Sequence, residues 1–311
     1  MTQRRRPTLR TTSLALAPLV LGLLGCPSYP GLAGRYADAE VAAAGELSPM
    51  GALAYQLCRK EAAYEFVLDI QNLDVEPPPW PVWYGATLAP STPRAALGAT
   101  PVTWQQYCDQ SERAASVIHA VSRGLRAHGR ALAALASGQP FDAGGLENTA
   151  DGIATASAAL GASTDFGTNA REVGSAFATA TKTFVDLYRE HQLERIVAGS
   201  DGCMQQTFAH LTEFAKALDE RLSLAEHSRE TAVRLLARTP SPPRLDRALV
   251  LAEALEAAGE ADHDLRQLRL ALGAYHAAIT SLAEAHQSLA VLADPRESKG
   301  DADVKKALTR L

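Results

Sequence analysis

The stretch TWQQYCDQSERAASVIHAVSRGLRAHGRALAALA, residues 103–136, decides the fold because it carries a long and regular heptad pattern. Its seam residues follow one another at alternating steps of three and four: Trp104, Tyr107, Ser111, Ala114, Ile118, Val121, Leu125, His128, Leu132 and Leu135. Residues at this spacing form one continuous stripe along an α-helix, as in a coiled coil. The stretch therefore predicts a long helix that packs its stripe against other helices.

Helices are also expected on both sides of this stretch. A preceding helix should begin at Ser48-Pro49, a cap residue followed by proline at the first helical position, and end near Asn72. After Gly138-Gln139-Pro140, apolar and small residues recur at seven-residue spacing through residues 142–197: Leu146, Ile153, Leu160, Gly167 and Gly174. We favour one continuous helix there, although Gly161-Ala162-Ser163-Thr164-Asp165 offers a break into two.

Two further helices complete the expected bundle. Gly199-Ser200-Asp201-Gly202 is interpreted as a turn, after which a helix should run to about Arg238 and stop at Thr239-Pro240-Ser241-Pro242-Pro243. The last helix should run from about Arg244 to Leu292. Helices joined by short turns lie antiparallel to their neighbours. The sequence thus predicts an all-α, elongated, antiparallel up-and-down bundle over residues 47–293, with coiled-coil-like seams.

Residues 74–102 form one Pro/Trp-rich loop inside this bundle, with VEPPPWPVWY at 75–84. Such a run of prolines cannot be helical, and a connection of this length is often functional. Trp80, Trp83 and Tyr84 are expected to bind a partner, because their rings bury a large area while keeping a polar tip. The alternative is an extended strap that lays these rings over the side of the bundle.

The N-terminal residues indicate the cellular location of the protein. Leu23-Leu24-Gly25-Cys26 ends an apolar run, Ser13 to Leu24, that follows Arg4, Arg5, Arg6 and Arg10. This arrangement is typical of a signal peptide rather than a membrane span. The four residues resemble the lipobox of bacterial lipoproteins, whose cysteine is diacylated and becomes the new N-terminus. The resemblance implies removal of residues 1–25, lipidation of Cys26, and a membrane-anchored protein facing the periplasm.

The N-terminal sequence gives weaker indications of which membrane holds the protein and by which route it is exported. Pro27 stands where an aspartate in enterobacterial lipoproteins resembles an inner-membrane retention signal, which favours the outer membrane. Arg5-Arg6 resembles a twin-arginine export signal without its usual aromatic residue, so folded export is an alternative to unfolded export. Two acyl chains hold a protein stably on a bilayer, whereas one holds it marginally.

The segments on either side of the bundle are expected to be irregular. Residues 26–46 hold Pro, Gly, Ala and scattered charges without a sustained apolar period, and are expected to form a flexible tether. Residues 294–311 should form a polar tail. Removing residues 1–25 takes away four of the 30 basic residues and none of the 35 acidic ones, which leaves a net charge of −9. A chain this acidic has no electrostatic case for binding nucleic acid or anionic lipid.

Besides Cys26 the chain contains Cys58, Cys108 and Cys203, an odd number in an oxidising compartment. Cys58 and Cys108 both adjoin seam residues and flank the Pro/Trp-rich loop, so a bridge between them would fix the base of that loop. This pairing is preferred. The competing Cys108–Cys203 bridge requires two helix starts at the same end of the bundle.

The sequence contains no motif that predicts catalysis or a cofactor. Glu260 and His263 make one Glu-x-x-His pair, and a di-iron bundle requires a second one. Glu253, Glu256, Glu260 and His263 are therefore interpreted as a solvated helix face. His128 and His286 occupy seam positions and are interpreted as hydrogen-bonded core residues rather than metal ligands.

These features predict a non-enzymatic, lipid-anchored helical scaffold or interaction protein of the cell envelope, with an envelope protein as its partner. Two alternatives are kept. One is a membrane-active bundle that resembles the α-type pore-forming toxins, although the apolar insertion segment they use is missing here. The other is a sensor or enzyme that binds a small molecule or a metal between its helices.

Overall fold

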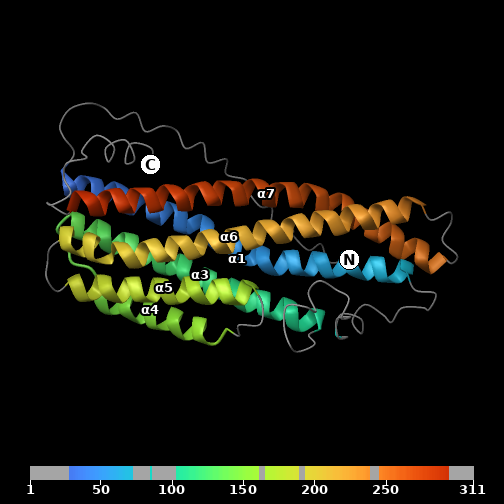
Figure 1. The fold of residues 1–311 in the computed structure, drawn as a ribbon, viewed down its shortest axis with the longest axis horizontal. Helices are drawn as coiled ribbons and strands as arrows, with labels where there is room; N and C mark the ends of the chain where they lie inside the picture. The colour runs from blue at the N-terminus through green and yellow to red at the C-terminus, as the bar shows by residue number, and fades with distance from the viewer. Residues whose placement is uncertain are drawn as a thin grey trace, which may run out of the picture.

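The protein is all-α in the part of the chain that its computed structural model describes: residues 28–72, 85, 103–160, 165–188, 193–238 and 245–293. Six helices occupy these ranges: α1 (Tyr29–Asn72), α3 (Trp104–Ala136), α4 (Ala143–Ala158), α5 (Asp165–Tyr188), α6 (Leu193–Arg238) and α7 (Leu245–Ala293). Successive helices run in opposite directions along one long axis (Figure 1). The predicted elongated, antiparallel up-and-down bundle is confirmed.

The bundle differs between its two ends. The six-helix end holds the N-termini of α1, α4 and α6 and the C-termini of α3, α5 and α7 (Figure 1). The three-helix end holds the C-termini of α1 and α6 and the N-terminus of α7, since α3, α4 and α5 do not reach it. α3 packs against α1, α4 and α5, and α6 packs against α1, α5 and α7. No helix in the described ranges is long and apolar enough to span a bilayer.

Small residues set the distance between α1 and α3. A Cβ atom on Gly51 would lie 2.7 Å from the Ala115 carbonyl oxygen, and one on Gly129 would lie 2.9 Å from the Ala37 carbonyl oxygen. Either contact would push the helices apart, so both glycines permit the close approach. The core also holds large side chains, and the largest fully buried ones are Tyr36, Phe177, Phe184, Phe208 and Phe214.

The prediction of a flexible tether over residues 26–46 is wrong, because α1 already begins at Tyr29. Ser28 starts the helix: its Oγ accepts a hydrogen bond from the Gly31 N–H at 3.4 Å, and Pro30 lies in the first turn, where its missing N–H costs little. Ala33, Tyr36 and Ala37 are fully buried. Their burial in the core outweighs the helix-breaking tendency of Pro30, Gly31 and Gly34.

The helix start predicted at Ser48-Pro49 is also wrong, because Pro49 lies inside α1. A proline there removes one backbone hydrogen bond and costs about 3 kcal/mol in an isolated helix. Leu47 and Met50 on either side are buried, and burial of two large apolar side chains is worth about as much. Tertiary packing therefore carries the helix through the proline.

The continuous helix favoured for residues 142–197 is wrong as well, because α4 ends at Ala158 and α5 begins at Asp165. The two helices pack against each other, with Gly174 of α5 directly against Ser157 of α4. The seven-residue spacing runs through both helices because each presents its own apolar stripe. The turn predicted at residues 199–202 is likewise absent, since α6 runs through it from Leu193.

Candidate functional site

The base of the Pro/Trp-rich loop is the best-defined candidate site. α1 and α3, the helices that flank the loop, are joined by a disulfide between Cys58 and Cys108, whose Cα atoms are 5.5 Å apart. This is the bridge that the sequence favoured, and Cys203 on α6 is free and partly buried. The disulfide links residues 50 positions apart, so it closes a ring of chain that contains the whole loop.

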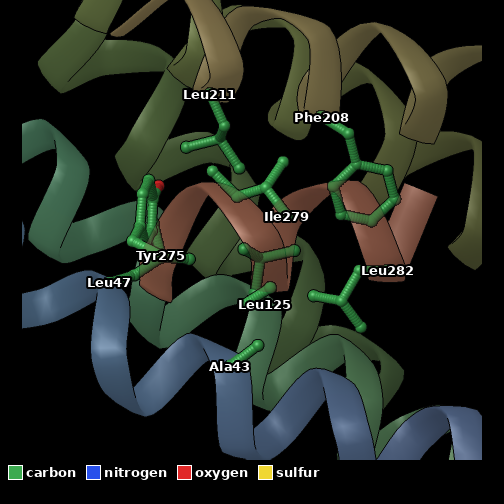
Figure 2. A pocket seen from close by; sticks show the side chains of 9 residues that line it. Ala43, Leu47, Leu125, Phe208, Leu211, Tyr275, Ile279 and Leu282 are labelled. Atoms are coloured by element: carbon green, nitrogen blue, oxygen red, sulfur yellow. The ribbon is translucent and has the colours of Figure 1, made fainter. Parts of the chain in front are cut away.

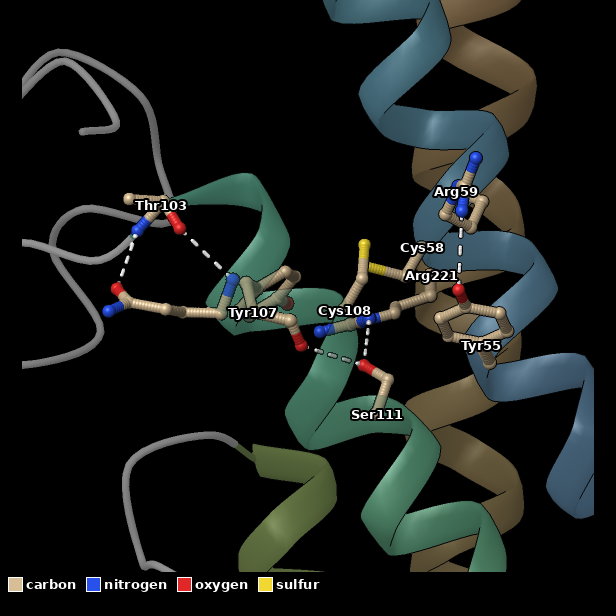
Figure 3. Close-up of a disulfide and its surroundings, with 9 residues drawn as sticks. Tyr55, Cys58, Arg59, Thr103, Tyr107, Cys108, Ser111 and Arg221 are labelled. Carbon is tan, nitrogen blue, oxygen red and sulfur yellow. Dashed lines mark hydrogen bonds between the residues drawn. A yellow bond between two sulfur atoms is a disulfide. The ribbon is translucent and has the colours of Figure 1, made fainter. Parts of the chain in front are cut away.

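A compact aromatic cluster surrounds the disulfide. Trp104 and Tyr107 are buried with both cysteines and Ala62, and their rings meet edge to face with centroids 6.0 Å apart. Arg221 of α6 lies over the Tyr107 ring at 4.4 Å from its centroid and donates a hydrogen bond to Ser111 Oγ at 3.4 Å (Figure 3). Three helices are thus tied together beside the bridge.

The first turn of α3 is also fixed where the loop enters it. The Thr103 side chain accepts a hydrogen bond from the Gln106 backbone N–H at 3.0 Å, and the Gln106 side chain accepts one from the Thr103 N–H at 3.0 Å (Figure 3). This reciprocal capping box satisfies N–H groups that a helix start leaves unpaired. Together with the disulfide, it gives the loop a rigid point of entry into the bundle.

Several residues predicted from the sequence lie outside the described residues. These are Cys26, Trp80, Trp83 and Tyr84. Glu253, Glu256, Glu260 and His263 fall within α7, but their side chains are outside the described set as well. For the loop, the structure supplies the two points between which it runs: Asn72, at the three-helix end of α1, and Thr103, at the start of α3.

A second polar region lies near the six-helix end, where a buried histidine–carboxylate pair links α1 to α3. Nδ1 of His128 lies 2.9 Å from Oε1 and 3.0 Å from Oε2 of Glu40. Both side chains are sealed from solvent, at 1% and 0% exposure. The imidazole packs edge-on against Phe184, and its Nε2 has no hydrogen-bond partner among the described residues.

A matching pair links α6 to α7. His286 Nδ1 lies 2.8 Å from Oδ1 of Asp201, which also accepts a hydrogen bond from Gln205 Nε2 at 3.2 Å. Burial pushes the pKa of Asp201 upward, but the hydrogen bonds from His286 and Gln205 outweigh it and hold the pKa below its ordinary value. The Asp201 side chain is 25% exposed, so this pair lies at the edge of the core.

Tyr36 connects the two pairs. Its ring meets the His286 ring edge to face at 5.3 Å, and burial, with Glu40 and Asp201 nearby, raises the pKa of its hydroxyl far above the usual range. The interpretation of both seam histidines as hydrogen-bonded core residues is therefore confirmed. The sequence missed their partners, because Glu40 fell in the expected tether and Asp201 in the expected turn. No cluster of three or more metal-binding side chains occurs in the described ranges.

One cavity lies between α1, α3, α6 and α7. Its free volume is about 10 Å³, and its lining is apolar: Ala43, Leu47, Leu125, Phe208, Leu211, Tyr275, Ala278, Ile279 and Leu282 (Figure 2). Small-molecule sites usually occupy about 300 Å³ or more and combine an apolar wall with several polar groups. This cavity offers only the Tyr275 hydroxyl, so its lining gives a ligand little to recognise.

Fold and site together define an elongated all-α bundle with a disulfide-tied loop base and a buried polar layer. Comparisons of the chain with protein-family models, with curated proteins and with solved structures find no match. Function must therefore be inferred from the geometry of the chain itself.

Proposed function

We propose that the protein is a non-enzymatic, lipid-anchored scaffold or interaction protein of the bacterial cell envelope, which presents its Pro/Trp-rich loop to an envelope protein. The observation that supports this most is the separation of the proposed anchor from the loop. The described chain begins at the six-helix end with Ser28, which follows Cys26 by two positions in the sequence. The loop departs from Asn72 at the other end of α1.

The length of α1 makes this separation large. Its 44 residues span about 66 Å at about 1.5 Å per residue. Because the helix begins at Tyr29, the chain that follows Cys26 is too short to act as a tether. An acylated Cys26 would hold the six-helix end at the bilayer, and the bundle would act as a rigid spacer between membrane and loop.

The loop carries the side chains best suited to a partner. Trp and Tyr dominate the energetics of protein interfaces, and Trp80, Trp83 and Tyr84 follow Asn72 by about a dozen residues or fewer. The disulfide and the capping box hold the base of this loop. A fixed base reduces the conformational entropy that the loop loses when a partner binds.

The test is crosslinking in cells, followed by identification of the envelope proteins joined to the lipidated chain. An alanine triple at Trp80, Trp83 and Tyr84 should abolish crosslinks that the native sequence makes, with helicity and melting temperature nearly unchanged. A matched triple in the same loop, at Thr87, Ser91 and Thr92, should keep them. In the same cells, Cys26→Ser should abolish incorporation of labelled fatty acid.

Two results would contradict the proposal. A fall of the melting temperature by many degrees in the aromatic triple would show that the rings cover the bundle, since truncation of a buried aromatic side chain costs about 3 kcal/mol or more. Unchanged crosslinks in the same variant would remove the loop as the binding surface.

A further inference from the structure

The outer face of α3 carries an arginine stripe that the bundle does not use. Residues 113–141 contain four arginines and two histidines but no aspartate or glutamate. Three of the arginines, Arg123, Arg126 and Arg130, follow one another at steps of three and four, so they share one face of the helix. Arg123 and Arg130 are exposed, and Arg126 is partly exposed. We call these three residues the arginine stripe.

The described residues do not neutralise the stripe. Across the described ranges, none of its guanidinium groups makes an ion pair or a side-chain hydrogen bond. Some other surface cations do: Lys182 lies 2.8 Å from Asp151, Lys216 lies 2.6 Å from Glu213, and Arg234 lies 3.1 Å from Glu230. The stripe therefore presents donors to whatever lies outside the bundle. 

The position of the stripe indicates what it meets. Arg130 is six residues from the C-terminus of α3, about 9 Å along the axis, and Arg123 about 20 Å. That terminus lies at the six-helix end, beside the start of α1 (Figure 1). On the neighbouring helix, the Arg126 guanidinium lies over Gly45, whose Cβ would be 3.5 Å from Nη2, so no α1 side chain at that position covers it.

We propose that the arginine stripe binds the anionic headgroups of a phospholipid bilayer at the six-helix end, while the rest of the bundle extends away from the membrane. A guanidinium group offers planar, paired donors that match phosphate oxygens. A straight ridge of three such groups suits an extended anionic surface better than a small enclosed ligand. This contact goes beyond the acyl anchor of the proposed function, because it uses side chains of the folded bundle and requires no lipidation.

The net charge of the chain argued against such binding, since the sequence without residues 1–25 carries −9. The positive charges of the stripe are separated from most of the acidic residues, however. At 0.1 M salt a membrane surface interacts mainly with protein charges within about 10 Å. The exposed carboxylates Asp38 and Glu46 lie on adjacent α1 and form no ion pair with the stripe in the described part of the chain. They weaken the local field, so binding should be moderate and strongly dependent on salt.

The test uses the chain from residue 26 onward with Cys26→Ser, which keeps every described helix and carries no acyl group. Cosedimentation should show binding to vesicles that contain phosphatidylglycerol but not to vesicles of phosphatidylcholine alone, with loss of binding as salt rises. The triple variant Arg123→Gln, Arg126→Gln, Arg130→Gln should lower the partition coefficient on the order of 100-fold, because each arginine near an anionic surface contributes a factor of about five.

A matched control removes the same number of positive charges elsewhere: Lys182→Gln, Lys216→Gln and Arg234→Gln, each taken from an existing ion pair. This control should bind as the parent does. Equal losses in both triples, no loss in the arginine triple, or no binding by the parent would each overturn the inference. Equally tight binding to a soluble DNA fragment would overturn it too, by showing general polyanion binding. None of these outcomes affects the loop crosslinks, so the proposed function is tested separately.

Discussion

The bundle holds its helices together by different chemistry in its two halves. Near the six-helix end, α1 is joined to α3 by the buried Glu40–His128 pair, whose two side chains are 0% and 1% exposed. Toward the three-helix end, the same two helices are joined by the Cys58–Cys108 disulfide. The pair stabilises the fold only while both partners are present, whereas the disulfide acts chiefly by restricting the unfolded chain. The two regions should therefore respond differently to substitution.

The largest effect is expected for His128→Leu. This change leaves the Glu40 carboxylate sealed in the core without its partner, which should lower the free energy of unfolding by about 3–5 kcal/mol in urea denaturation. The double variant Glu40→Met, His128→Leu should recover most of that loss, because two apolar side chains need no partner. A double variant as unstable as the single one would show that packing, rather than the buried charge, sets the cost.

A somewhat smaller effect is expected for Cys58→Ala combined with Cys108→Ala. Opening a ring of this length should lower the free energy of unfolding by about 2–4 kcal/mol, mainly through the entropy of the unfolded chain. Circular dichroism of the native state should stay unchanged. A clear loss of native helicity would show instead that the disulfide holds α1 and α3 in place, as the histidine pair does.

The smallest effect is expected for Asp201→Asn, because this carboxylate lies at the edge of the core. The loss should be about 1–2 kcal/mol at neutral pH, less than for a fully buried hydrogen bond to a charged group because solvent screens this carboxylate. The pKa of Asp201 is lowered in the folded protein from its ordinary value of 3.8. Its contribution is therefore fully present above about pH 4 and is lost as pH falls through the lower, folded pKa.

The measurement is chemical denaturation of both proteins at neutral and acidic pH. The difference between the native sequence and Asp201→Asn should shrink below about pH 4. A difference that stays constant through this range would mean that ionisation of Asp201 contributes nothing, and that the pair resembles an ordinary neutral hydrogen bond.

The sequence predicts well where large apolar residues mark a local period. Ile118, Val121, Leu125 and Leu132 define α3, and the same spacing places α7 to within one residue at each end. The disulfide could be preferred because both cysteines adjoin such seams and flank one loop. Each of these inferences uses a local feature of the sequence: the spacing of apolar residues, or the position of a cysteine next to such a residue.

The start of α1 could not be predicted in this way. Its buried positions include Ala33, Ala37 and Ala44, which add little to an apolar period, while Pro30 and Gly31 argue locally against a helix. The decisive contacts are made with α3, α6 and α7, far away in sequence. Glu40 could therefore not be recognised as the partner of His128.

The turn predicted at residues 199–202 of α6 is wrong for a related reason. Gly199 lies in the second turn of α6, and a Cβ there would come within 2.5 Å of Cδ1 of Leu187 on α5, so that side chain would have to move. The glycine permits close packing between two helices instead of a turn. Local sequence alone does not distinguish these two uses of glycine.

The start of α1 at Tyr29 has a consequence for biogenesis. Enzymes that acylate and cleave a lipoprotein precursor work on exposed chain, and sites of proteolysis concentrate in exposed, poorly packed segments. Only Pro27 and Ser28 separate Cys26 from a helix that is fully buried at Ala33. If Cys26 is the acylated residue, maturation must precede the docking of the first turns of α1. For an acylated Cys26, the chain would first be fixed to the membrane, and the bundle would close afterwards.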